Sequence, residues 1–415
     1  MSSTTSPVPR SVAIVGAGPA GLIAAETLAK AGLAVTVHDR MPSVGRKLLM
    51  AGRGGLNLTH SEPLEAFLGR YGSAAGRLRP LIEAFPPAAL RAWAEALGET
   101  TFVGSSGRVF PTSMKASPLL RAWLRRLDEL GIRFELRHDW QGFDADRQLV
   151  FGRADGSTET VAPDATLLAL GGASWPRLGS NGRFADILWE KGVDITPLRP
   201  ANVGFRVEWS EMFRTRFAGT PLKALSIGFQ DITLRGEAMV TTHGLEGGVV
   251  YALSAQLRDA IARDGHAMIH LDLAPGRSAS DLAARIHAQK PGQSLSNLLR
   301  KAAHLPPVAI NLMREGNGPA LPREPEALAA LIKAVPIRLS GTEGLDRAIS
   351  TAGGVAWSGI DDKLMLKALP GVFVAGEMID WEAPTGGYLL QASFATGIAA
   401  AKGILARLGL DPAAS

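Results

Sequence analysis

The sequence predicts an α/β fold in which a doubly wound sheet is interrupted by a large insertion, and three observations predict it. The first is a short β-rich segment near residue 11 that leads directly into a glycine-rich turn and an Ala/Leu-rich helix. The second is a similar apolar segment near residue 371, also followed by a glycine-containing turn and an apolar helix. The third is the length of 415 residues, which exceeds one ordinary core and indicates two lobes or an inserted unit.

Composition excludes several classes of protein. The chain has no cysteine, so it has no disulfide, Cys-ligated zinc, iron–sulfur cluster or thiol nucleophile. Its net charge is only +5 and no block of five or six like charges occurs, so we expect attraction for small anions and no stable nucleic-acid partner. The uncharged stretch 383–401 contains Pro384 and Gln391, which favours a buried helix over a membrane span. His266 and His270 lack carboxylates at useful spacing, and no metal site is expected.

The first motif combines a strand, a glycine turn, a helix and an acid. Residues 11–15 form the predicted strand, a helix continues to about residue 32, and a second strand at 34–38 ends in Asp39. Asp39 follows the third glycine of the turn by 18 residues, a spacing typical of dinucleotide-binding domains. The turn itself reads Gly16-Ala17-Gly18-Pro19-Ala20-Gly21.

Each position in this motif has a physical task. Gly16 permits the tight turn, Gly18 lets the backbone approach a pyrophosphate, and Gly21 lets the helix pack closely on the strand. The helix start at Pro19 and Ala20 supplies N–H donors and a partial positive charge. An acid at position 39 accepts hydrogen bonds from ribose hydroxyls and repels a 2′-phosphate, so the dinucleotide is predicted to be FAD or NAD rather than NADP.

The two ends of the chain together favour FAD. Asp39 is followed by basic residues and a glycine-rich loop, in which we expect cofactor contacts from Arg40, Arg46, Lys47, Gly54 and Asn57. Near the other end, a predicted strand delivers Gly376 and Glu377, and a helix begins close to Gly386, Gly387 and Tyr388. Flavoproteins of the two-dinucleotide-binding-domain type close their FAD site with such an element, which NAD dehydrogenases do not need.

Over its whole length the chain resembles a family of bacterial flavoproteins, the NAD(P)/FAD-dependent oxidoreductases that include aminoacetone-oxidase-like and bile-acid-reducing members. The resemblance rests on six runs, which are Gly45-Arg46-Lys47, the loop ending Asn57-Leu58-Thr59, Gly171-Gly172-Ala173-Ser174, Thr242-His243-Gly244, Thr351-Ala352-Gly353-Gly354-Val355, and Gly376-Glu377-Met378-Ile379-Asp380 with Gly386-Gly387-Tyr388. It implies a cytoplasmic, nucleotide-binding oxidoreductase with FAD, in which Gly171 lies where the chain crosses the cofactor. Many relatives carry Arg-Cys-Asn where this chain has Gly55-Leu56-Asn57, so no thiol can act here.

Several residues are candidates for binding or catalysis, each with a simpler alternative. Glu377 is predicted to hydrogen-bond the ribityl chain, or else to be a solvated turn acid. Arg46 and Lys47 would contact FAD phosphates or an anionic substrate, or else be surface cations. His243 is the candidate proton-handling residue because its pKa range suits acid–base work, or else it is structural. Asn57 would act on the flavin, or else cap a surface turn.

The predicted organisation is discontinuous. Residues 1–195 and 336–415 form the Rossmann-like FAD-binding domain, 196–275 a β-rich insertion that covers flavin and substrate, and 276–335 a small helical subdomain. The insertion contains no second G-x-G-x-x-G in a strand–helix context, so NAD(P)H, if used, would dock transiently.

The predicted function is that of an FAD-dependent oxidoreductase acting on a small-molecule substrate. Hydride or electrons would pass through flavin N5 between NAD(P)H or a small organic substrate and an acceptor. Three alternatives remain open. They are an FAD-dependent amine oxidase using oxygen, a flavin-containing protein that modifies or binds RNA, and a flavin-binding structural or sensor protein with no turnover.

Overall fold

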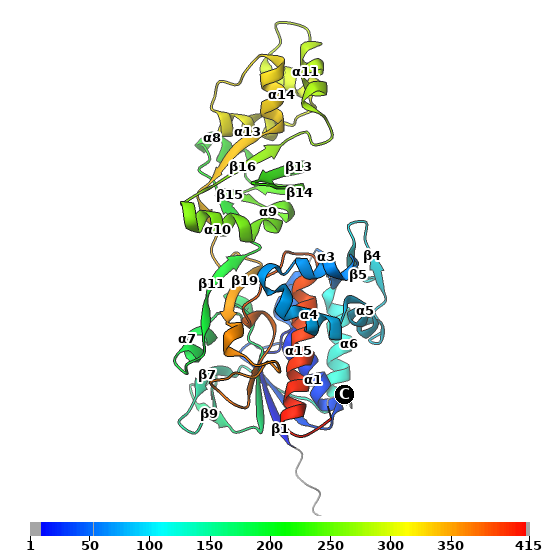
Figure 1. Cartoon of the computed structure of the whole chain (residues 1–415), viewed down its shortest axis with the longest axis vertical. Helices are drawn as coiled ribbons and strands as arrows, with labels where there is room; N and C mark the ends of the chain where they lie inside the picture. Colours follow the sequence, from blue (N-terminus) through cyan, green and yellow to red (C-terminus); the bar gives the residue numbers. More distant parts are fainter. Residues whose placement is uncertain (1–9, 53, 412–415) are drawn as a thin grey trace, which may run out of the picture. The chain divides into compact units, whose positions relative to one another are not determined.

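The structure is a computed structural model that describes residues 10–52 and 54–411, and these form two compact units (Figure 1). Unit 1 combines both ends of the chain, Met1–Arg199 and Ser350–Ser415. Unit 2 is the segment between them, Pro200–Ile349. Each unit has its own apolar core, so each is described by itself.

The centre of unit 1 is a parallel five-stranded sheet in the order β20-β10-β1-β2-β6. Its strands are β1 (Ser11–Val15), β2 (Ala34–Asp39), β6 (Arg133–Leu136), β10 (Ala165–Leu168) and β20 (Val372–Val374). Helix α1 (Pro19–Lys30) packs against α15 (Tyr388–Arg407), so the first and last helices lie side by side (Figure 1). The predicted α/β fold with a Rossmann-like core is confirmed. In such sheets ligands bind beyond the carboxyl ends of the strands.

Further elements surround this sheet. The helices are α2 (Arg46–Ala51), α3 (Leu64–Gly69), α4 (Ala75–Ala84), α5 (Pro87–Glu95), α6 (Ala116–Glu129) and α7 (Phe184–Trp189), with 3-10 turns η1 (Gly72–Ala74), η2 (Pro176–Leu178), η3 (Trp357–Gly359) and η4 (Gly376–Met378). Two small antiparallel sheets are β3 (Thr59–His60) with β5 (Arg108–Pro111) and β4 (Thr101–Val103), and β7 (Asp139–Phe143) with β8 (Leu149–Gly152) and β9 (Thr158–Val161).

Unit 2 is built on a seven-stranded sheet in the order β17-β16-β13-β14-β15-β12-β18. Its strands are β12 (Phe205–Arg206), β13 (Pro221–Phe229), β14 (Ile232–Val240), β15 (Gly244–Glu246), β16 (Ala267–Asp272), β17 (Val335–Leu339) and β18 (Gly341–Thr342). Its helices are α8 (Glu211–Phe217), α9 (Gly248–Ala252), α10 (Ser254–Asp264), α11 (Ala279–His287), α12 (Leu295–Ala302), α13 (Pro307–Asn317) and α14 (Pro325–Lys333).

Two details differ from the sequence-based organisation. The chain returns to unit 1 at β19 (Ser350–Val355), later than residue 336, because β17 pairs antiparallel with β16 and completes the sheet of unit 2. Residues 248–264, which lie within the predicted β-rich insertion, form helices α9 and α10 because Leu253 and Leu257 recur at helical spacing and are buried together. The chain enters unit 2 through β11 (Ile195–Ala201), which pairs with β19.

Helix α15 is the 20-residue helix that begins at Tyr388. It is long and apolar enough to cross a membrane by length and composition, but 61% of its most apolar window is buried inside the protein. Its small residues allow close packing, since a Cβ at Gly397 would lie 2.4 Å from the carbonyl oxygen of Ala20 in α1. The helix is therefore part of the core of unit 1.

Candidate functional site

The glycine turn after β1 has the shape of a dinucleotide-binding loop. Gly16 has a φ of +111°, and a Cβ there would lie 2.3 Å from the carbonyl oxygen of Ala169. A Cβ at Gly21 would lie 2.0 Å from the Gly16 carbonyl oxygen. Both positions therefore require glycine for packing within the protein, as the sequence predicts.

Gly18 is different, because nothing in the protein lies within 4 Å of the place its Cβ would occupy. It is the N-cap residue of α1, with Pro19 at the first helical position and no capping side chain. The N–H groups of the first helical turn have no intrahelical acceptor and carry the positive end of the helix dipole. The protein thus leaves an open space beside free N–H donors, which suits a pyrophosphate.

Asp39 closes the other side of this loop. The Ala17 N–H donates to one carboxylate oxygen at 2.7 Å, and the Met41 N–H donates to the other at 2.8 Å. Burial raises the pKa of Asp39, and these two hydrogen bonds oppose that rise. Each oxygen keeps a second lone pair for a ribose hydroxyl. Arg40, the neighbouring candidate, forms an ion pair with Asp139, in which its Nε lies 3.5 Å from the Oδ1 atom.

A buried histidine pair supports the same loop and was missed by sequence reasoning. The Nδ1 atoms of His38 and His138 are 3.2 Å apart, and both rings are almost fully buried beside Phe151. The His38 carbonyl accepts the Gly16 N–H at 2.8 Å, and the His138 N–H donates to the Asp39 carbonyl at 3.0 Å. Only contact in space reveals this pair, since the two residues are 100 positions apart in the sequence.

This buried histidine pair predicts that the folded protein loses stability at acidic pH. Burial, together with repulsion from His138, lowers the pKa of His38 to about 4 from its ordinary 6.5. Above about pH 6.5 His38 is neutral in both the folded and the unfolded protein. As the pH drops from 6.5 toward 4, only the unfolded protein takes up this proton, so the free energy of unfolding falls by about 1.4 kcal/mol per pH unit. We expect His38→Phe to flatten the pH dependence of the free energy of unfolding. Exposed His287→Gln is the control, and an unchanged slope in His38→Phe would contradict the assignment.

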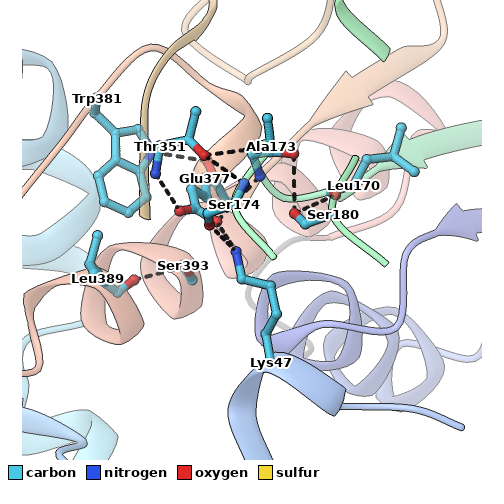
Figure 2. Close-up of polar contacts among 12 residues, drawn as sticks. Lys47, Leu170, Ala173, Ser174, Ser180, Thr351, Glu377, Trp381, Leu389 and Ser393 are labelled. Atoms are coloured by element: carbon cyan, nitrogen blue, oxygen red, sulfur yellow. Dashed lines mark hydrogen bonds and ion pairs between the residues drawn. The ribbon is translucent and has the colours of Figure 1, made fainter. Parts of the chain in front are cut away.

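Lys47 and Glu377 meet at the centre of the site (Figure 2). The Lys47 ammonium, from α2, lies 2.8 Å from the Glu377 carboxylate and donates to the Ser174 hydroxyl at 2.9 Å. Glu377 also accepts the Thr351 N–H at 3.0 Å and the Gly172 N–H at 3.3 Å. The pair thus joins four segments from both ends of the chain.

Thr351 and Ser174 complete this network, although they were not predicted as site residues. The Thr351 hydroxyl accepts the N–H groups of Ala173 and Ser174 at 2.8 and 3.1 Å. Gly171 precedes them with a φ of +69°, and a Cβ there would lie 2.6 Å from the Ser180 hydroxyl. Both missed residues lie within runs that carry the family resemblance, and this position in the runs could have identified them as site residues.

Two buried polar atoms near these elements have no hydrogen-bond partner in the described part of the chain. One is Oδ1 of Asn57, and the other is Nε of Arg46. Arg46 uses another guanidinium nitrogen to donate to Ser43 at 3.1 Å. Unsatisfied buried polar atoms are rare and mark places where a ligand or water completes the site. Gly54, the remaining candidate of this loop, is exposed with open space at its Cβ position.

The start of α15 lies directly against β3, which begins at Thr59. Gly387, with a φ of +95°, is its N-cap, and a Cβ there would lie 2.4 Å from the Thr59 Cα. Gly386 has a φ of +142°. Tyr388 turns its ring inward, where its hydroxyl donates to Glu62, while burial and this hydrogen bond raise its pKa. Tyr388 therefore offers a cofactor its backbone N–H rather than its phenol.

His243 lies in unit 2, in the turn between β14 and β15, and its side chain is exposed. Its backbone is held by hydrogen bonds to Thr241 and Val207. Its catalytic role stays a prediction. Across residues 10–52 and 54–411, no group of three His, Cys, Asp or Glu is arranged to hold a metal ion.

Unit 1 fits FAD by several independent features. The open position at Gly18 beside the α1 N-terminus suits a pyrophosphate, and Asp39 has lone pairs for a ribose. The unpartnered Asn57 and Arg46 atoms and the free N–H groups of α15 provide polar partners for the rest of the cofactor.

Comparison with known proteins agrees with this fit. Residues 10–403 match the family described as HI0933-like protein Rossmann domain. A 3-dehydro-bile acid delta(4,6)-reductase of Clostridium scindens is 26% identical and aligns over 94% of this chain and 98% of its own length. A ribosomal RNA dihydrouridine synthase of Haemophilus influenzae is 25% identical over 94% of this chain and 97% of its own.

A solved structure supports the fold. The 3-ketosteroid delta1-dehydrogenase of Sterolibacterium denitrificans superposes with a TM-score of 0.55 at 13% identity, over 96% of this chain and all of the other. The family match covers most of the chain and both units, and FAD is the cofactor. The chain therefore belongs to the HI0933-like Rossmann-domain family of FAD-binding oxidoreductases.

Proposed function

We propose that this protein is an FAD-dependent reductase that saturates a carbon–carbon double bond conjugated with a carbonyl group. The observation that carries the proposal is a reaction common to two differently named relatives. The name of one denotes reduction of ring double bonds in a 3-keto bile acid, and the name of the other denotes saturation of the uracil ring. In both substrates the double bond is conjugated with a carbonyl.

The reaction balances with a nicotinamide donor. NAD(P)H is oxidised, the β-carbon of the substrate gains a hydride, and the α-carbon gains a proton. Bound FAD supplies the hydride chemistry. Transient docking of NAD(P)H remains part of the proposal, because the sequence has no second dinucleotide motif. His243 stays the predicted source of the proton.

The residues of unit 1 have binding and orienting roles in this proposal. Gly18 and the α1 N-terminus would hold the pyrophosphate, and Asp39 the adenosine ribose. The N–H groups at the start of α15 would stabilise negative charge on the flavin. Lys47 and Glu377 fix the neighbouring loops, because their ion pair joins segments from both chain ends.

Anaerobic titration tests the proposal. We expect NADH or NADPH to bleach the flavin absorbance of the purified protein, and a conjugated 3-keto steroid or a uridine-containing RNA to restore it. Bleaching by a small amine without NAD(P)H would instead support the amine-oxidase alternative. Bound FAD that none of these donors reduces would contradict any reductase.

The reduction of uracil in RNA is a second candidate for the substrate. It is favoured by the relative named as a ribosomal RNA dihydrouridine synthase, which aligns with this chain through both units. A free steroid-like enone and a base in RNA share the reacting group but differ in charge. A surface that binds polyanions would therefore favour the RNA substrate over the free enone.

A further inference from the structure

Unit 2 contains a long segment without acidic residues. Residues 282–314 include no Asp or Glu, but they include five Lys or Arg residues and two histidines. These are Arg285, His287, Lys290, Arg300, Lys301, His304 and Arg314. Because the cations are spaced along the sequence, they do not form the block of like charges that identifies a basic tail.

The fold gathers most of them at two adjacent helix ends. Arg285, in the last turn of α11, donates to the Ala302 carbonyl at 2.8 Å, and another of its guanidinium nitrogens lies 3.4 Å from His304 Nε2. Arg300 and Lys301 occupy the last turn of α12, directly before Ala302. The carboxyl ends of α11 and α12 therefore lie together and carry positive charge from both helices.

These cations are not neutralised by carboxylates among the described residues. Arg300 donates to the neutral Asn297 amide at 2.8 Å, and its side chain, like those of Lys290 and Lys301, is exposed. The acids that flank the segment are otherwise engaged, since Asp281 pairs with Arg277 and Glu315 accepts from Ser210. Ser294, Ser296 and Asn297 add neutral hydrogen-bonding groups along α12.

Helix dipoles explain only part of this charge. A cation in the last turn of a helix is stabilised by the dipole, which accounts for Arg285 and Arg300. It does not account for Lys290 in the connecting loop or for the missing acids. Uncompensated surface cations attract polyanions over distances of about 10 Å.

We propose that the surface formed by Lys290, Arg300, Lys301 and His304, with Arg285 behind them, binds the phosphate backbone of RNA. This rests on the proposed function, in which a uracil ring in RNA is one candidate substrate. The segment has no Phe, Tyr or Trp for base stacking, so its contacts would supply affinity and position rather than sequence choice.

A membrane surface fits these observations less well. Helices that lie on membranes combine basic residues with exposed large apolar side chains that enter the lipid. Within the described chain, the exposed large hydrophobic residues all lie outside 282–314. The apolar side chains of α11 and α12, such as Leu282 and Leu299, are buried in unit 2.

The test compares two matched variants of the full-length flavoprotein. The first combines Lys290→Gln, Arg300→Gln and Lys301→Gln, and leaves Arg285 in place because it holds the two helices together. The control combines Arg77→Gln, Arg121→Gln and Arg125→Gln, three exposed cations of unit 1. Both variants lose three positive charges. A difference in RNA affinity between them therefore reflects where the lost charges lie rather than the change in net charge.

Binding of a fluorescent mixed-sequence RNA is measured at several salt concentrations. We expect the wild type and the control to bind alike, and the first variant to bind at least tenfold more weakly. Its plot of log affinity against log salt should be shallower by roughly 2 units, because about three phosphate contacts are lost. Equal RNA binding by the two variants, no RNA binding even at low salt, or equal competition by anionic lipid vesicles would overturn the proposal.

A second measurement separates this proposal from the proposed function. NAD(P)H-dependent reduction of a free conjugated ketone should be unchanged in the first variant, because its substitutions leave unit 1 intact. If neither the wild type nor the variant reduces the ketone or a uridine-containing RNA, but RNA binding still depends on the three cations, the reductase assignment fails and the RNA surface stands.

Discussion

Gly18→Val is expected to abolish FAD binding while leaving the FAD-free protein folded. A Cβ at this position meets no protein atom within 4 Å, and the φ of −87° suits any residue, so we expect the fold to accept the side chain. It does occupy the space beside the first N–H groups of α1, where a pyrophosphate must approach. Loss of those charge-assisted hydrogen bonds should cost at least about 3 kcal/mol, or roughly 100-fold in Kd.

The measurement is FAD titration of the apoprotein, followed by thermal unfolding with and without FAD. Wild-type protein should gain thermal stability with FAD because the ligand binds only the folded state, and Gly18→Val should not. Gly76→Val is the control, since Gly76 lies in the first turn of α4 and, like Gly18, has open space at its Cβ position. A yellow Gly18→Val protein with wild-type affinity would show that the pyrophosphate does not pass this glycine.

The contrast between Gly16, Gly18 and Gly21 shows what the sequence could predict. All three positions follow from one spacing, because the motif is local and its neighbours along the chain form the turn. The structure also agrees with the motif on which glycines serve packing and which one leaves open space. Only the structure supplies the distances of 2.3 and 2.0 Å that exclude a side chain at Gly16 and Gly21.

The parts that were not predicted depend on contacts between distant segments. His38 and His138 are 100 positions apart, and nothing in either local sequence indicates that their rings meet. Thr351 and Glu377 lie on different elements, and their hydrogen bond requires β19 and η4 to be adjacent. The positive surface of unit 2 was missed for the same reason, because spaced cations become neighbours only when α11 and α12 fold together.

Glu377→Ala is expected to destabilise the FAD-free protein by about 3 kcal/mol. Removing the carboxylate leaves the Thr351 and Gly172 N–H groups without an acceptor and leaves Lys47 without its counter-ion. The Lys47 side chain is 27% exposed, so water recovers part of the ion-pair energy, and the lost backbone hydrogen bonds dominate. Urea unfolding measures the change, with exposed Glu190→Ala as a control expected to stay within about 0.5 kcal/mol.

A double-mutant cycle with Lys47→Met identifies how the network acts. If Lys47 and Glu377 stabilise one another, the double variant should lose less stability than the sum of the single variants, by about 1 kcal/mol or more. Glu377→Gln should fall between wild type and Glu377→Ala, because its amide oxygen can still accept one of the two N–H groups. Additive effects of Lys47→Met and Glu377→Ala would mean that the carboxylate acts on the Thr351 and Gly172 backbone alone. The lysine would then be free to bind a phosphate of the cofactor, as the sequence predicts.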